Sequence, residues 1–193
     1  ISFRGKSQGT LNWGLMGEHN RMNALAALAA AHHAGVTIEI GITALRKFKN
    51  VKRRMELCGV ANEITVYDDF AHHPTAIQTT LEGLRNKIND ARIIAVLEPR
   101  SNTMRMGTWQ DRLAECLKAA DLVFCYTSNL GWDVEEALKP IGSRAVSSDN
   151  LEKLIEAITV ATHPGDYVLI MSNGGFGGIQ EKILKSLNTI HQS

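Results

Sequence analysis

Four ionisable side chains lie within six consecutive positions, directly after one strand-like run of the sequence. They are Asp68, Asp69, His72 and His73. Pro74 follows at a place that suits the first turn of a helix. In α/β proteins a turn between a strand and a helix start often holds a ligand, because unpaired N–H groups at the helix start can face an anion. A surface turn whose Asp and His residues only cap and solvate the chain is the alternative, but four such groups favour a functional site.

Two more loops follow predicted strands and carry groups that suit anions. Arg100 and Arg105 lie in the loop Glu98–Gly107, where guanidinium groups could bind carboxylate or phosphate; a solvated basic loop is the alternative. The loop Ser172–Gly178 contains four glycines, but it lacks the Lys-Ser/Thr ending of a P-loop. Tight turning of the backbone explains these glycines equally well. Such loops converge at the carboxyl edge of a parallel sheet, so we expect them to be neighbours of the Asp/His turn.

A polar segment at the start of an alanine-rich helix holds a further set of candidates. His19, Asn20 and Asn23 come just before the run Ala24–Ala34, and the two asparagines share a helix face because they are three positions apart. Capping of the helix by Asn20 is the alternative. It does not account for the other two residues.

A polar and basic run, Lys49–Met55, marks the predicted boundary between residues 1–50 and residues 51–193. Such a run is usually a solvated linker. The functional alternative is that Arg53 or Arg54 binds a phosphate.

Strands alternate with helices from Glu56 to Leu187, which predicts the α/β class with a doubly wound, mostly parallel sheet. Strands are predicted at 56–60, 64–67, 92–97, 122–126, 144–147 and 167–171, and helices at 75–87, 109–118, 134–138, 151–162 and 179–187. The first two strands are separated by a short turn and form a predicted hairpin, and Asp149 is the predicted N-cap of the helix at 151–162. Two helices, at 24–34 and 38–48, precede the boundary.

The composition limits the classes of partner. A formal net charge of +1 gives no electrostatic case for nucleic acid or an anionic membrane surface, and no apolar run approaches membrane-spanning length. Cys58, Cys116 and Cys125 are odd in number and lie in apolar runs, which is typical of reduced thiols in a cytoplasmic protein. The chain opens with Ile1 in the middle of a pattern, so we expect a fragment of a longer polypeptide.

Three segments resemble the Mur ligase family and occur in the family's order. Gly17–Ala27 is similar to its Gly-x-His-Asn-x-x-Asn-x-x-Ala-Ala segment, and Arg53–Glu56 resembles its Arg-(Met/Leu/Phe)-Glu domain junction. Asp68–Thr75 resembles its Asp-(Asp)-Tyr-(Gly/Ala)-His-x-Pro segment, with Phe70 in place of the commoner Tyr. The paired histidines and the loop Leu97–Arg105 are most similar to the branch that adds a preformed murein tripeptide.

The resemblance implies an ATP-dependent amide ligase with ATP and Mg²⁺ as cofactors. ATP would phosphorylate the lactyl carboxylate of UDP-N-acetylmuramate, and the amine of the tripeptide L-Ala-γ-D-Glu-meso-diaminopimelate would attack the acyl phosphate. Residues 1–50 would be the helical tail of the central ATPase domain, and residues 51–193 the Rossmann-like C-terminal domain. The family's P-loop and uridine-nucleotide domains would be partners on the same chain, so this part alone is expected to be inactive.

The resemblance also assigns a role to each candidate residue. Adenine would be held by Asn20 and Asn23, with His19 near the nucleotide. Arg54 would contact the ATP phosphates and Asp69 the ribose. His72, Arg100 and Arg105 would face the incoming peptide or the acyl phosphate. No residue of this chain is assigned as a metal ligand.

Other functions remain open at this point. Within the enzyme class, the alternatives are the alanine-adding ligase and a folylpolyglutamate-type relative. Outside it, a nucleotide-binding regulatory module without chemistry is possible. A nicotinamide-dependent dehydrogenase is disfavoured because no Gly-x-Gly-x-x-Gly follows the first strand.

Overall fold

The structure is a computed structural model that describes residues 1–15, 17–49 and 51–190. The chain divides into two compact units, Ile1–Lys52 and Arg53–Ser193, and each is described by itself. Residue 50, at the predicted boundary, lies outside the described residues.

The first unit consists of a small hairpin and two helices. β1 (Ser2–Phe3) pairs antiparallel with β2 (Lys6–Ser7), and α1 (Glu18–His33) is followed by α2 (Ile38–Arg46). α1 begins six residues before the alanine-rich run, with Gly17 as its N-cap, so the interpretation of Asn20 as the cap is wrong. The middle of α1, Ala24–Ala31, has only apolar side chains, yet only Ala24 and Leu28 of this helix are buried. A helical stretch that is apolar on every side usually packs against neighbours on more than one face.

A six-stranded sheet forms the second unit, in the order β3-β4-β8-β5-β6-β7. The strands are β3 (Glu56–Ala61), β4 (Ile64–Asp69), β5 (Ile93–Leu97), β6 (Leu122–Tyr126), β7 (Ala145–Ser148) and β8 (Tyr167–Met171). β3 and β4 form the predicted antiparallel hairpin, whereas every other pairing is parallel. The last strand, β8, therefore lies between β4 and β5.

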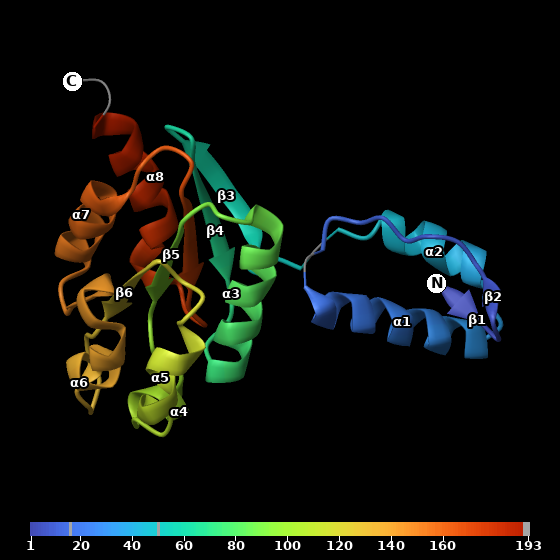
Figure 1. Cartoon of the computed structure of the whole chain (residues 1–193), viewed down its shortest axis with the longest axis horizontal. Helices are drawn as coiled ribbons and strands as arrows, with labels where there is room; N and C mark the ends of the chain where they lie inside the picture. The colour runs from blue at the N-terminus through green and yellow to red at the C-terminus, as the bar shows by residue number, and fades with distance from the viewer. Residues whose placement is uncertain (16, 50, 191–193) are drawn as a thin grey trace. The chain divides into compact units, whose positions relative to one another are not determined.

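Helices cover both faces of this sheet (Figure 1). α3 (Pro74–Ile88), α5 (Gln110–Cys116) and α6 (Val134–Leu138) pack on one core, and α7 (Leu151–Ala161) and α8 (Ile179–Ile190) pack on the other. Short helical segments complete the chain: α4 (Asn102–Arg105), η1 (Lys139–Arg144) and η2 (Phe176–Gly178). The predicted α/β class with a doubly wound, mostly parallel sheet is confirmed.

Two local predictions need correction. The N-cap of α7 is Asn150, whose side chain accepts a hydrogen bond from Lys153 N at 3.0 Å, and not Asp149. The loop after β5 is not entirely irregular, because Ser101 caps the single turn α4 within it. Short polar side chains compete for cap positions, and neighbouring candidates cannot be ranked by residue type alone.

Candidate functional site

Three loops meet at the carboxyl ends of three adjacent strands, β4, β8 and β5. Ser172 N donates to Asp69 O at 3.1 Å, and Glu98 N donates to Met171 O at 3.0 Å. The ends of β4, β8 and β5 are thus joined side by side by backbone hydrogen bonds. The predicted convergence of the three loops is confirmed.

The loops after β8 and β5 are also joined through side chains. The Ser172 hydroxyl donates to a Glu98 carboxylate oxygen and accepts a hydrogen bond from Gly174 N at 2.9 Å. Ser172 is completely buried. A buried hydroxyl with both its donor and its acceptor capacity used holds the two loops in one arrangement.

The two aspartates at the end of β4 are buried and bonded to nearby protein groups. Arg53 Nε donates to Asp68 Oδ2 at 2.9 Å. Asp69 accepts from Met55 N and Ala71 N, both at 2.8 Å, and is 3% exposed. Burial raises the pKa of Asp69, while these two backbone N–H groups and the charge of Arg54 act in the opposite direction. Both carboxylates hold the segment 53–56 against the end of the strand.

The arginine pair at the start of this unit divides into two environments. The Arg53 guanidinium also donates to Ser172 O at 2.5 Å, and its carbonyl accepts from Phe70 N at 2.8 Å. Arg54 is exposed, and its guanidinium lies 5.7 Å from the centre of the Phe70 ring. Arg53 is therefore a structural residue of the strand ends, and Arg54 is the one that faces outward.

The two histidines pack against different neighbours. His72 Nδ1 lies 2.8 Å from Phe70 O, and its ring packs edge-on against Phe70 with centroids 5.2 Å apart. The ring of His73 packs against Trp109 at 4.7 Å. Both imidazoles are half-buried. His73 thus supports the start of α3, and the orientation of His72 is set by the Phe70 carbonyl and ring.

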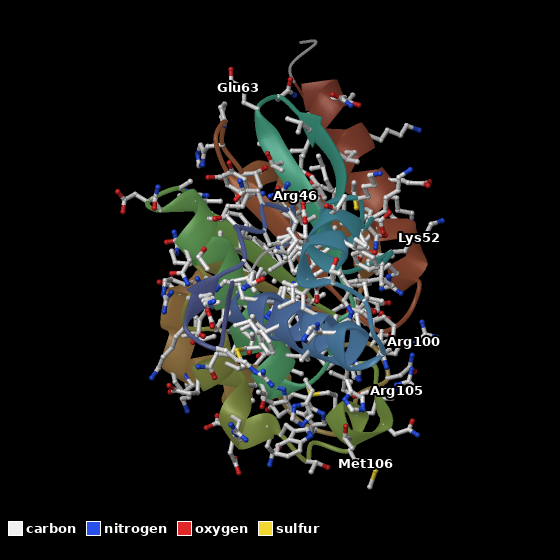
Figure 2. The ribbon with its side chains drawn as sticks, turned by 90° about the vertical axis from the view of Figure 1, so that its right-hand side faces the viewer. Arg46, Lys52, Glu63, Arg100, Arg105 and Met106 are labelled. Atoms are coloured by element: carbon white, nitrogen blue, oxygen red, sulfur yellow. The ribbon has the colours of Figure 1, made fainter. Side chains whose placement is uncertain are left out.

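Arg100 and Arg105 are exposed, and within the described part of the chain neither guanidinium has a hydrogen bond or an ion pair. Figure 2 shows both side chains in the segment that leads into and through α4. Arg105 N donates to Ser101 O at 2.8 Å, so the backbone between them is ordered as one helical turn. Two cations without counter-ions beside the strand ends can bind carboxylate or phosphate oxygens.

The remaining candidates, His19, Asn20 and Asn23, belong to the first unit. They lie in the first two turns of α1, and the ring of His19 lies against Gly17. The loops that meet at the sheet edge therefore carry Asp69, His72, Arg100 and Arg105, and the segment bonded to Asp69 carries Arg54.

Some residues of this site were not singled out from the sequence. Ser172, Glu98 and Gly174 join the loops, and Asn173 Oδ1 is buried with no hydrogen-bond partner within the described residues. The signal that could have found Ser172 and Glu98 is their position, since each is the first polar residue after an entirely apolar strand.

A family model, that of the Mur ligase glutamate ligase domain, matches residues 53–174. The chain belongs to the Mur ligase family. Over 97% of its length it is 50% identical to the UDP-N-acetylmuramate–L-alanyl-γ-D-glutamyl-meso-2,6-diaminoheptandioate ligase of Escherichia coli, and 49% identical to the ligase of that name from Haemophilus influenzae. It spans 41% and 42% of the lengths of these relatives. The crystal structure of a murein peptide ligase from Psychrobacter arcticus is 42% identical with a TM-score of 0.70, and the match covers 95% of this chain and 40% of that one.

The described part of this Mur ligase chain has neither a cluster of metal ligands nor a membrane-spanning helix. In residues 1–15, 17–49 and 51–190, no group of three or more His, Cys, Asp or Glu side chains could hold a metal ion. No helix in the same ranges is long and apolar enough to cross a membrane. A surface groove of about 620 Å³ lies between α7 and α8, lined by residues of these helices rather than by the strand ends.

Proposed function

We propose that this chain is part of an ATP-dependent ligase that joins UDP-N-acetylmuramate to the tripeptide L-Ala-γ-D-Glu-meso-diaminopimelate during peptidoglycan recycling in the cytoplasm. The observation that carries the proposal is the identity of 49–50% over 97% of the chain to two ligases whose names specify this reaction. The match includes the loop of Arg100 and Arg105 as well as the junction of Arg54.

The overall reaction takes place in two steps, a phosphoryl transfer and the formation of an amide. The carboxylate of UDP-N-acetylmuramate takes the terminal phosphoryl group of ATP, which releases ADP. The amine of the tripeptide then attacks the acyl carbon, loses a proton and displaces phosphate, which leaves an amide. The reacting groups carry negative charge in both steps, and fixed cations near them lower the energy of the transition state.

The residues at the sheet edge supply such cations. Arg54 would contact the phosphates of ATP, because it is exposed at the junction while Arg53 beside it is bonded to Asp68. Arg100 and Arg105 would bind carboxylates of the tripeptide, since neither is paired within the described residues. His72 would face the peptide or the acyl phosphate from the edge of Phe70.

Asp69 is proposed to contact the ribose of ATP, and Asn20 and Asn23 the adenine, with His19 near the nucleotide. Each oxygen of Asp69 already accepts a backbone N–H, but a carboxylate offers about four lone-pair positions, so a further donor can be accepted.

Mur ligases in general use ATP and Mg²⁺. The cationic and amide groups named above suit the phosphates and base of ATP. The described residues provide no set of ligands for Mg²⁺, and we assign no step to the ion. We propose that the P-loop and the uridine-nucleotide site lie elsewhere in the full protein, with residues 1–50 as the end of the central domain and 51–193 as the C-terminal domain.

The test is an assay of the full-length protein with UDP-N-acetylmuramate and ATP, in which the tripeptide and L-alanine are compared as acceptors. We expect ADP release and a product of the tripeptide mass, and little product with L-alanine. Product only with L-alanine would show an alanine-adding ligase, and ATP binding without any product would show a regulatory module. The 193-residue chain alone is expected to give no product.

A further inference from the structure

Two of the four glycines in the loop after β8 lie directly under a side chain: Leu151 lies over Gly177, and Arg100 lies over Gly174. A Cβ placed on Gly174 would lie 2.6 Å from both Cδ and Cζ of Arg100, and closer still to Nη1. The Arg100 side chain therefore crosses directly over the Gly174 backbone. A residue with any side chain at this position would occupy the same space.

Backbone conformation does not explain why a glycine is found here. Gly177 and Gly178 have φ values of 58° and 70°, which favour glycine, whereas the φ of Gly174 lies outside this left-handed region. Alanine could adopt the backbone of Gly174 without strain. The feature that an alanine would disturb is the path of Arg100.

A chain of hydrogen bonds connects the backbone of Arg100 to the backbone of Gly174. Arg100 N donates to the Glu98 carbonyl at 2.8 Å. The Glu98 carboxylate accepts from Ser172, whose hydroxyl accepts from Gly174 N. Glu98 thus bonds to the backbone of Arg100 and, through Ser172, to the backbone over which the arginine side chain passes. Little freedom is left for either loop to move away from the other.

We propose that Gly174 is a positioning residue for Arg100 and through it sets the affinity for the carboxylate of the acceptor peptide. The proposal rests on the proposed function, in which Arg100 binds that peptide. A long arginine side chain loses rotamer freedom when it binds an anion, and a side chain already held in one path loses less. The glycine loop then acts on a carboxylate through Arg100, and not as a phosphate-binding turn.

The test compares Gly174→Ala with Gly175→Ala in the full-length ligase. Gly175 has φ −75° and nothing within 4 Å of a Cβ, so it is a matched control in the same loop. We expect Gly174→Ala to raise KM for the tripeptide by about tenfold, the loss of roughly one charged hydrogen bond. KM for ATP, kcat and Tm should stay close to wild type, because Arg100 is exposed and its end can move aside.

A double-mutant cycle with Arg100→Ala separates the possible outcomes. If Gly174 acts through Arg100, Gly174→Ala should have no further effect once the arginine is removed. Equal effects of the two glycine variants, or an effect of Gly174→Ala that persists in the Arg100→Ala background, would overturn the positioning role. An unchanged tripeptide KM in Arg100→Ala alone would instead refute the role of Arg100 in the proposed function. A wild-type protein that forms no tripeptide product would refute the function itself.

Discussion

Charged residues at the ends of β4 and β5 differ in what they bind. At the end of β4, Asp68 and Asp69 are buried and bonded to Arg53, Met55 and Ala71. After β5, the two arginines are exposed and unpaired within the described residues. The denser cluster of charge is thus bonded within the protein, whereas the sparser one has no partner among the described residues. The number of ionisable residues in a turn does not reveal this difference. It depends on which groups from other parts of the chain form hydrogen bonds with the turn.

The largest expected effect is on stability at the end of β4. Arg53→Ala removes the partner of Asp68, which is 6% exposed and already has one oxygen without a hydrogen bond among the described residues. We expect the free energy of unfolding to fall by about 3 kcal/mol, since a buried carboxylate would be left without a counter-ion. Urea unfolding of the purified protein measures this change.

The matched control for this experiment is Arg100→Ala, which removes the same side chain from the other region. Its guanidinium has no hydrogen bond in the part of the chain that the structure describes, so we expect a change within about 0.5 kcal/mol. Similar losses for the two variants would contradict the division into a bonded and an unbonded region.

The next largest effect is on acceptor binding, and we expect it from the arginines after β5, whose removal should change stability little. In the full-length ligase, Arg100→Ala and Arg105→Ala should each raise KM for the tripeptide by about tenfold, because each removes a charge-assisted hydrogen bond of roughly 1.5 kcal/mol. Steady-state kinetics with ATP and UDP-N-acetylmuramate held at saturation measure it.

Lys185→Ala is the control for the loss of charge in that experiment. It is an exposed cation in the middle of α8, away from the strand ends. The tripeptide KM of this variant should match wild type. If all three variants change KM equally, the arginines contribute only to the overall charge of the protein, and the proposed contacts are wrong.

Local sequence patterns predicted much of this fold but not the roles of the charged groups. β6 and β8 were predicted with the bounds observed, because an apolar run between polar turns is a local signal. The insertion of β8 between β4 and β5 was not predictable, since pairing between distant strands has no local signature. The burial of Asp68 likewise depends on Arg53, fifteen positions earlier in the chain. Residue type therefore placed the candidate residues on these loops, while the partners that separate bonded from unbonded charge required the fold.

The smallest expected effect concerns the titration of Asp69. Because burial raises its pKa above the ordinary value of 3.8, the folded protein holds this proton more tightly than the unfolded chain. The stability that Asp69 contributes is therefore greatest below its ordinary pKa and is lost as the pH rises through the raised value. Asp69→Asn cannot ionise, so the free energy of unfolding of wild type should fall relative to that of the variant as the pH rises above 3.8.

Urea unfolding of both proteins across this range measures the difference between their free energies of unfolding. Titration of the groups that the two proteins share cancels in this difference. Asp69→Asn also turns one hydrogen-bond acceptor into a donor that faces Met55 N or Ala71 N, which should cost about 1 kcal/mol at every pH. That cost shifts the difference in free energy of unfolding by the same amount at every pH, whereas ionisation makes the difference depend on pH. The two contributions can therefore be separated. Parallel curves would mean that the hydrogen bonds from Met55 and Ala71 fully offset the burial of the carboxylate. A slope of the opposite sign would mean that these bonds and the charge of Arg54 outweigh it, which would make the end of β4 a site built for an ionised aspartate.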